Sequence, residues 1–155
     1  MLRYMLDTNI CIYVIKNRPP ALRQRFNERA EHLCVSSVTL AELLYGAEKS
    51  ARPDRGASFI ARGDSPARPE TNIVVVEGFA ARLAVLPFDD RAAAHYGQIR
   101  GELERKGTPI GPYDLMIAAH ARCEGLTLVT HNVREFRRVA GLRVENCVSP
   151  GSRSA

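Results

Sequence analysis

The sequence predicts an α/β fold with a central, mostly parallel sheet flanked by helices. Three observations favour it. Short apolar segments recur along the chain, each is followed within a few residues by a segment of helical periodicity, and polar residues stand where the two kinds of segment meet. A length of 155 residues suits one domain with a sizeable core. Ligands of open α/β sheets bind at the carboxyl ends of the strands, so the functional residues are expected there.

The first third of the chain alternates between the two kinds of segment. Asp7, Thr8 and Asn9 are each able to cap the helix that follows the first strand. Pro19 and Pro20 end that helix, and Pro20 suits the first turn of the next one. The elements expected here are strands at 2–6 and 33–36 and helices at 10–16, 21–29 and 40–49.

Residues 51–72 interrupt the alternation. The stretch is rich in Arg, Pro and Gly and shows almost no periodicity, which predicts an inserted, flexible loop. Loop closure costs little extra free energy as a loop lengthens, so the fold is expected to tolerate the insertion. We therefore expect a single domain over residues 1–148 and a disordered tail at 149–155.

The alternation resumes after this loop. Helical spacing of apolar residues predicts a helix at 73–83, although the valine run at 74–76 also suits a strand. Asp89 and Asp90 are candidate caps for a long helix, and Pro112 suits the first turn of another. The other elements expected here are strands at 84–86, 126–130 and 142–144 and helices at 90–106, 112–124 and 134–139.

Composition narrows the class of partner. The net charge is +5 with a pI near 9.3, which favours a polyanion such as nucleic acid, although an acidic protein partner would explain the charge equally well. No apolar run approaches the roughly 20 residues that span a bilayer, and the N-terminus lacks a signal-peptide pattern. We expect a cytoplasmic protein. Four scattered cysteines without a C-x-x-C pair are expected to be reduced thiols.

Three carboxylates stand where secondary structure is expected to change. Asp7 follows the first strand, Glu42 opens the helix after the second strand, and Asp114 lies in the first turn behind Pro112. If the fold brings them together, their like charges share one pocket. Such a pocket is tolerable mainly when it holds a divalent cation with oxygen ligands, so the pattern indicates Mg²⁺-assisted phosphodiester chemistry.

Each carboxylate also has a purely structural interpretation. Asp7 could cap a helix, Thr39 and Glu42 match an S/T-x-x-E capping box, and Asp114 could complement a helix dipole. Spacing alone leaves these alternatives open. Other chemistries fit less well, because the sequence has no P-loop and no G-x-S-x-G elbow. A phosphatase of the haloacid-dehalogenase type would need a second acid at Asn9, and His131 is interpreted as a loop histidine.

Four segments in the same order carry a family resemblance. They are residues 5–12, 35–46, 109–121 and 128–132, the last followed by Arg134-Glu-Phe136. Together they resemble PIN-domain ribonucleases of the VapC type, the toxin half of VapBC toxin–antitoxin pairs. The resemblance covers nearly the whole chain outside residues 51–72.

The resemblance implies a set of site residues. Asp7, Glu42 and Asp114 correspond to the catalytic acids, and Asp7 and Asp114 to the principal ligands of Mg²⁺, with Mn²⁺ as an alternative ion. Many PIN domains carry a further Asp where this chain has Asn132, which lowers the negative charge by one and weakens a second metal position. The residues that resemble the polar support of the acids are Thr8, Asn9, Ser37 and Thr130.

The resemblance also implies an activity and partners. The expected reaction is hydrolysis of RNA phosphodiesters by a metal-activated water, with structured RNA such as tRNA favoured. The expected partners are a VapB-type antitoxin, whose C-terminal segment would lie over the toxin's groove, and a second copy in a homodimer. With only 6% aromatic residues, extensive base stacking is not expected. The alternative is a catalytically weak PIN fold that acts as a module binding RNA or antitoxin.

Overall fold

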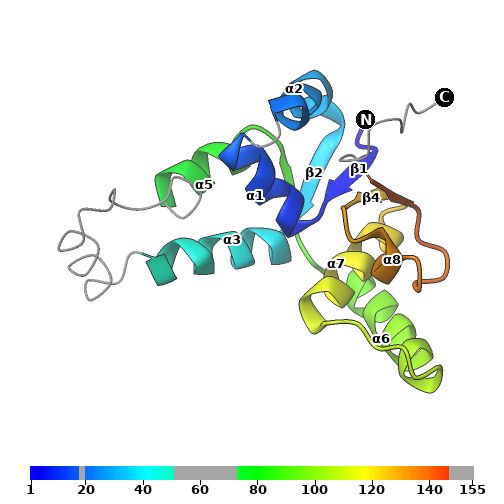
Figure 1. Cartoon of the computed structure of the whole chain (residues 1–155). Coiled ribbons are helices and arrows are strands. Elements are labelled where there is room, and N and C mark those ends of the chain that lie inside the picture. Colours follow the sequence, from blue (N-terminus) through cyan, green and yellow to red (C-terminus); the bar gives the residue numbers. More distant parts are fainter. Residues whose placement is uncertain (18–19, 51–72, 147–155) are drawn as a thin grey trace.

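A five-stranded parallel sheet forms the centre of the protein. The computed structural model describes residues 1–17, 20–50 and 73–146. The strands lie in the order β3-β2-β1-β4-β5, and every pair of neighbours is parallel (Figure 1). The strands are β1 (Tyr4–Leu6), β2 (Leu33–Ser36), β3 (Ala84–Leu86), β4 (Thr127–Val129) and β5 (Val144–Glu145). The predicted α/β class is confirmed.

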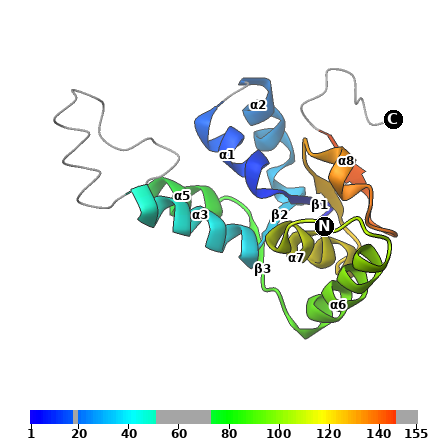
Figure 2. The same cartoon turned by 60° about the horizontal axis from the view of Figure 1, so that its bottom comes forward.

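Helices cover both faces of this sheet. One group (α1, α2, α3 and α5) packs with one core cluster, and the other (α6, α7 and α8) packs with a second (Figures 1 and 2). The helices are α1 (Thr8–Lys16), α2 (Pro20–Arg29), α3 (Ser37–Ser50), α5 (Ile73–Ala80), α6 (Asp90–Arg105), α7 (Pro112–Cys123) and α8 (Val133–Phe136), with the 3-10 turn η1 (Ala30–His32) before β2. The valine run at 74–76 is therefore helical, which confirms the helix and excludes the strand.

The strands supply both cores in alternation. Met5 belongs to the cluster on the α6–α7 face, whereas Leu6 belongs to the cluster beneath α1 and α2. Leu128 and Val129 divide in the same way. Successive side chains of a strand point to opposite faces, and here both faces are covered, so the strands read as continuous apolar runs rather than alternating ones.

Strand order places a crevice at the carboxyl end of β1. The chain runs from β1 outward through β2 to β3, then returns across the sheet to β4 and β5 on the other side. Leu6 pairs with Val129, and the amide of Asp7 donates to the carbonyl oxygen of Val129 at 3.0 Å. Connections therefore leave β1 and β4 in opposite directions, which opens the space that ligands of open α/β sheets use.

Local capping chemistry is confirmed at two helices. Asp7 caps α1, because its Oδ1 accepts from the amide of Thr8 at 2.8 Å. Asp89 caps α6, because its Oδ1 accepts from the amide of Ala92 at 3.1 Å. At the other end of α1, Asn17 takes a left-handed conformation with φ of 57°, which asparagine adopts more readily than most residues.

The capping box at Thr39 and Glu42 is wrong. Helix α3 begins at Ser37 rather than near residue 40, because β2 passes into it without a linker. Thr39 therefore lies inside the helix, and the cap is Ser36, whose Oγ accepts from the amide of Val38 at 3.1 Å. Glu42 belongs to the second turn, so its carboxylate is not committed to the helix terminus.

The last strand also differs from its expected position. It forms at Val144–Glu145 rather than at 142–144. Gly141, with φ of 79°, turns the chain just before it, and the amide of Leu142 still donates within that turn to the oxygen of Val139. The expected loop at 51–72 and tail at 149–155 lie outside the described residues. No helix in the described part is long and apolar enough to cross a membrane.

The thiols agree with the expectation of reduced cysteines where they are described. Cys11 and Cys34 are free and buried, and Cys123 is free and half-buried. Burial raises the pKa of Cys34 to about 12, so this thiol is inert at neutral pH. Cys147 lies outside the described residues.

Phe136 packs α8 against the core, and its substitution tests this packing. Its side chain is fully buried, so Phe136→Ala should lower the free energy of unfolding by about 3–5 kcal/mol through lost burial and a cavity. Arg137→Ala, at an exposed neighbour, should change it by less than about 0.5 kcal/mol. Denaturant unfolding followed by circular dichroism measures both, and equal effects would contradict this packing.

Candidate functional site

Asp7 is the most enclosed acid of the molecule's described part. Its side chain is only 2% exposed at the carboxyl end of β1. Oδ1 accepts from the amide of Thr8, and Oδ2 accepts from the hydroxyl of Thr130 at 2.8 Å. These bonds lower the pKa of the Asp7 carboxyl, but burial outweighs them and the net shift is upward. Asp7 is thus fixed in orientation from both neighbouring strand ends, β1 and β4.

Glu42 approaches Asp7 from α3. The hydroxyl of Thr8 donates to its Oε1 at 2.7 Å and lies 3.3 Å from the hydroxyl of Thr39. Burial raises the pKa of the Glu42 carboxyl, the bond from Thr8 lowers it, and the charge of Asp7 raises it further. Thr8 therefore connects the helix after β1 to the helix after β2, as expected of a supporting residue.

Asp114 completes the predicted group of three acids. It lies in the first turn of α7, half-exposed, behind Pro112. Burial raises the pKa of its carboxyl to about 6, and the charge of Asp7 is the strongest of the neighbouring charges that add to this shift. Glu42 acts in the same direction. The fold thus brings the three carboxylates within electrostatic reach of one another, as the sequence predicted.

A fourth carboxylate, Glu135, belongs to the same group and was missed from the sequence. Its charge raises the pKa of both Asp7 and Asp114. Glu135 lies in the first turn of α8, which follows β4, in the same strand-to-helix setting as Asp7 and Glu42. That setting was the signal that could have found it. The carboxylate of Glu135 therefore supplies a fourth negative charge beside Asn132, the position where one was expected to be missing.

Asn132 supports this fourth acid. Its side-chain amide donates to Oε2 of Glu135, and its backbone amide donates to the hydroxyl of Thr130 at 3.0 Å. Thr130 in turn donates to Asp7. A continuous chain of hydrogen bonds therefore runs from Glu135 through Asn132 and Thr130 to Asp7. Asn132 and Thr130 both act as supporting residues in this chain.

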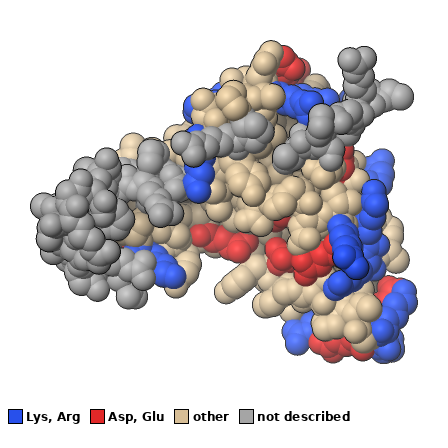
Figure 3. Space-filling view, in the orientation of Figure 1, with Lys and Arg blue, Asp and Glu red and all other residues tan. Residues whose placement is uncertain are grey.

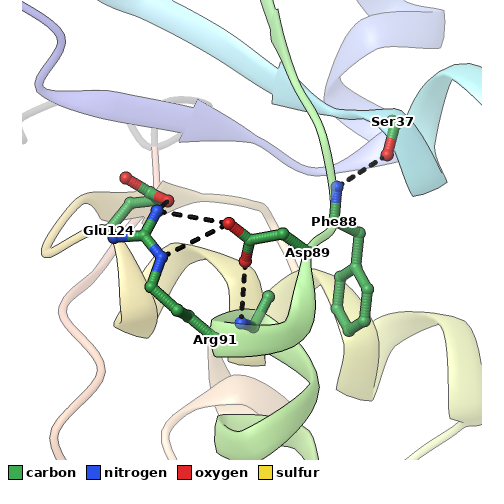
Figure 4. A network of polar contacts seen from close by, with 6 residues as sticks. Ser37, Phe88, Asp89, Arg91 and Glu124 are labelled. Atoms are coloured by element: carbon green, nitrogen blue, oxygen red, sulfur yellow. Dashed lines mark hydrogen bonds and ion pairs between the residues drawn. The ribbon is translucent and has the colours of Figure 1, made fainter.

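The remaining supporting residues have different environments. Asn9 is exposed in the first turn of α1 and bonds to none of the four acids in the described structure. The hydroxyl of Ser37 accepts from the amide of Phe88 at 3.0 Å, so it holds the link between β3 and α6 rather than a carboxylate (Figure 4). His131 is exposed, 5.2 Å from the ring of Tyr13, and its charge lowers the pKa of Asp7.

The link after β3 continues into a polar network at the start of α6. Arg91 pairs with Asp89 at 3.3 Å and with Glu124 at 3.2 Å, joining the start of α6 to the end of α7 (Figure 4). Both pairs are exposed and contribute little free energy individually. Their effect is to help orient α7, the helix that presents Asp114.

The four carboxylates have the donor chemistry of a hard-cation site. Within the described ranges, no lysine or arginine forms an ion pair with any of them. No three Asp, Glu, His or Cys side chains in those ranges converge into a complete metal-binding cluster either. Mg²⁺ suits such an open arrangement, because it usually binds one or two carboxylates and keeps several waters and phosphate oxygens. Asp7 and Asp114 are the residues of this group that could hold such an ion.

An apolar cleft of about 680 Å³ has Glu42 in its wall. It is lined by residues of α3 and α7, including Glu42, Tyr45, Tyr113 and Met116. Tyr45 and Tyr113 are 68% and 59% exposed. Acidic atoms reach the surface over α3 and over the α7–α8 region, and basic atoms border the second patch (Figure 3). Arg134, Arg137 and Arg138 are exposed on and just after α8.

Burial of Asp114, together with the neighbouring negative charges, predicts a pH-dependent stability of the metal-free protein. The folded-state pKa lies above the value of 3.8 for an unperturbed carboxyl, so the contribution of Asp114 to stability is present below about pH 4 and is lost as pH rises through about 6. Asp114→Asn should therefore stabilise the metal-free protein by about 1 kcal/mol above pH 6, less than the full shift because the side chain is half-exposed.

Denaturant unfolding in EDTA at several pH values measures this difference. It should disappear below about pH 4, where the carboxyl is protonated in both states. The control is Glu77→Gln, an exposed carboxyl on α5, which should show no such trend. A destabilised Asp114→Asn protein at neutral pH would contradict the free-energy cost of the buried, like-charged carboxylate.

Comparison with known proteins shows which family the chain resembles. The PIN domain model matches residues 4–142. The chain is 53% identical over 146 residues to a protein of Salmonella typhimurium named tRNA(fMet)-specific endonuclease VapC, covering 94% of this chain and 98% of the relative. It is 52% identical over 148 residues to Ribonuclease VapC2 of Haemophilus influenzae, covering 96% of this chain and 100% of the relative.

Solved structures agree with the sequence matches. A DNA-bound VapBC structure from Salmonella typhimurium is similar with a TM-score of 0.79 at 53% identity, over 94% of this chain and 98% of that chain. VapBC2 of Rickettsia felis, bound to a DNA fragment from its promoter, is similar with a TM-score of 0.74 at 36% identity, over the same shares. The expected PIN-like fold is confirmed, and the chain belongs to the PIN domain family and to its VapC group.

Proposed function

We propose that this protein is a Mg²⁺-dependent endoribonuclease, the toxin of a type II toxin–antitoxin module. The observation that carries the proposal is the gathering of four carboxylates at the carboxyl edge of β1 and β4, where no lysine or arginine of the described residues pairs with them. Their pKa values are raised where this is resolved, which means that the metal-free site holds its charges at a free-energy cost. A divalent cation offsets that cost.

The residues divide into holding and activating roles. Mg²⁺ held by Asp7 and Asp114 would acidify a coordinated water and offset charge on the scissile phosphate. Thr8 holds Oε1 of Glu42, so the second oxygen, Oε2, is available to orient the attacking water and accept its proton. The raised pKa of Glu42 favours this role, because a stronger base accepts a proton more readily near neutral pH. No protein nucleophile is required.

Two features beside the acids support RNA as the substrate. Arg134, Arg137 and Arg138 are exposed on and just after α8, where they can contact backbone phosphates. Tyr45 and Tyr113 offer exposed ring faces along the cleft that contains Glu42, and unpaired RNA bases stack on such rings. Although aromatic residues are few, two of them border the site. The name of the Salmonella relative favours tRNA-like structured RNA as the substrate class.

The proposed partner is a VapB-type antitoxin. Similar solved structures are VapBC complexes, at 53% and 36% identity to this chain. We further propose a homodimer that acts in the cytoplasm, where structured RNA is the substrate.

The alternative function is a catalytically weak PIN fold that binds RNA or antitoxin without cleavage. Asn132 motivated that alternative, because it replaces an acid found in many relatives. The position of Glu135 weakens it, since the site keeps a fourth carboxylate. A cleavage assay separates the two, because a binding module would retain RNA affinity without metal-dependent products.

Metal dependence is the direct test of the proposed activity. Antitoxin-free protein should cleave structured RNA in Mg²⁺ or Mn²⁺, and EDTA should abolish cleavage. Asp7→Asn and Asp114→Asn should each lower kcat/KM by about 100-fold or more, because both remove charge that holds the cation. Glu77→Gln, remote on α5, should cleave normally. Cleavage that persists in both Asp variants would refute the site.

Glu135 gives a second, graded test. Glu135→Gln keeps the shape of the side chain but removes one of the four charges, so the Mg²⁺ concentration for half-maximal cleavage should rise about 10-fold. Asn132→Asp adds a carboxylate beside Glu135 and should shift that concentration in the opposite direction. Titration of cleavage rate against Mg²⁺ measures both, and an unchanged midpoint in Glu135→Gln would exclude its electrostatic role.

A further inference from the structure

We propose that His120 is a positioning residue, which fixes the start of α3 against α7 through the hydroxyl of Ser36. These two helices carry Glu42 and Asp114, so the proposal assigns to His120 the relative placement of two acids that it does not touch. It rests on the proposed function only for its consequence in catalysis. The structural link itself stands on geometry.

His120 is completely buried on α7. Its Nδ1 lies 2.8 Å from Oγ of Ser36, the last residue of β2. The same Oγ accepts from the amide of Val38 at 3.1 Å and so caps α3. One serine hydroxyl therefore joins the imidazole of one helix to the first turn of the other.

The available hydrogen-bond partners indicate which of the two groups, His120 Nδ1 or the Ser36 hydroxyl, donates the proton in this contact. If Nδ1 is unprotonated, Ser36 donates to it and accepts from Val38, and the only group left over is Nε2–H. If Nδ1 carries the proton, both the serine hydrogen and the Nε2 lone pair are left without a partner. The first arrangement satisfies more groups. Ser36 then acts as donor to α7 and as acceptor for α3 at once.

A second contact passes through the same ring. Phe88 packs edge-on against His120, with ring centroids 5.7 Å apart at 86°. The amide of Phe88 donates to the hydroxyl of Ser37, the first residue of α3 (Figure 4). The imidazole thus contacts both groups that hold the start of α3, one through its nitrogen and one through its ring.

Packing alone does not account for a histidine at this position. Nε2 has no hydrogen-bond partner, and it is the single buried side-chain nitrogen or oxygen left so within the described residues. An apolar ring of similar size would avoid this cost of burial. Burial also lowers the pKa of His120, so the side chain is neutral at physiological pH and gains no ion pair. The bond to Ser36 is the interaction that an apolar ring could not make.

The positions of the acids explain why this bond matters. Asp114 lies in the first turn of α7, and Glu42 lies in the second turn of α3. The start of α3 is joined to α7 through Ser36 and His120. A small displacement of one helix start would therefore change how the two carboxylates face one another, and misplacement of that size has large effects on rate.

Two substitutions separate the hydrogen bond from the ring. His120→Asn keeps an acceptor, since Oδ1 occupies the same place along the side chain as Nδ1, but it loses the ring. His120→Phe keeps the ring and its contact with Phe88 but has no acceptor. Ser36→Ala breaks the same bond from the other side. Unfolding midpoints of all three report stability separately from position.

The first readout is kinetic. His120→Phe and Ser36→Ala should lower kcat for RNA cleavage about 10-fold with KM little changed, whereas His120→Asn should stay within about threefold of the original protein even if it is the less stable of the two. Ser36→Ala removes the bond to His120 and also the cap on the Val38 amide. The double variant should therefore lose little more than Ser36→Ala alone, because the bond that His120→Phe removes is already absent there. Equal kcat in the Phe and Asn variants, or losses that follow stability alone, would overturn the proposal.

The second readout does not depend on activity. Hydrogen exchange of the Val38 amide should accelerate in His120→Phe and stay near the original rate in His120→Asn, and Mg²⁺ binding by calorimetry should weaken about 10-fold only in the former. Failure of the original protein to cleave RNA would refute the proposed function, yet the exchange rates would still decide the link. Unchanged Val38 exchange in His120→Phe would refute the link whatever the activity.

Discussion

Crowded negative charge at the end of the central strands is the constraint on which this protein is built. Asp7, the most enclosed acid, accepts hydrogen bonds on both oxygens from the residues that follow β1 and β4. Burial and neighbouring carboxylates nonetheless raise its pKa. A fold selected for stability alone would neutralise such a group. Keeping four carboxylates together makes sense where a cation and a phosphate complete the site.

The scaffold around the acids is correspondingly rigid and mostly neutral. Threonine and serine hydroxyls carry the connections: Thr8 joins α1 to Glu42, Thr130 joins β4 to Asp7, and Ser36 joins β2 to α7. Hydroxyls suit this task because each can donate and accept without adding charge. A lysine or arginine in the same positions would form ion pairs with the acids and neutralise their charge.

Asp7, Glu42 and Glu135 come from three different strand-to-helix junctions, whereas Asp114 comes from the start of α7, which follows α6. Each acid therefore lies at or near the start of a helix. The carboxyl ends of parallel strands converge at one edge, and helices start there with their first turns facing the crevice. Positions on strands and helix starts move less than positions on loops. The same arrangement makes the site depend on how helix starts are held, which is why a buried histidine remote from the reaction acquires a role in it.

The sequence by itself determined the layered α/β fold and most of the helices, because apolar periodicity and caps are local signals. It also identified Asp7, Glu42 and Asp114 as a candidate group, whose role stays a prediction. Its errors were non-local. The capping box at Thr39 failed because β2 runs directly into α3. Glu135 was missed because only the pairing of β4 beside β1 brings α8 to Asp7. Tertiary structure alone decided which carboxylates lie close enough to interact electrostatically. The strength of that interaction depends on the distance between the charges in space and not on their separation along the chain.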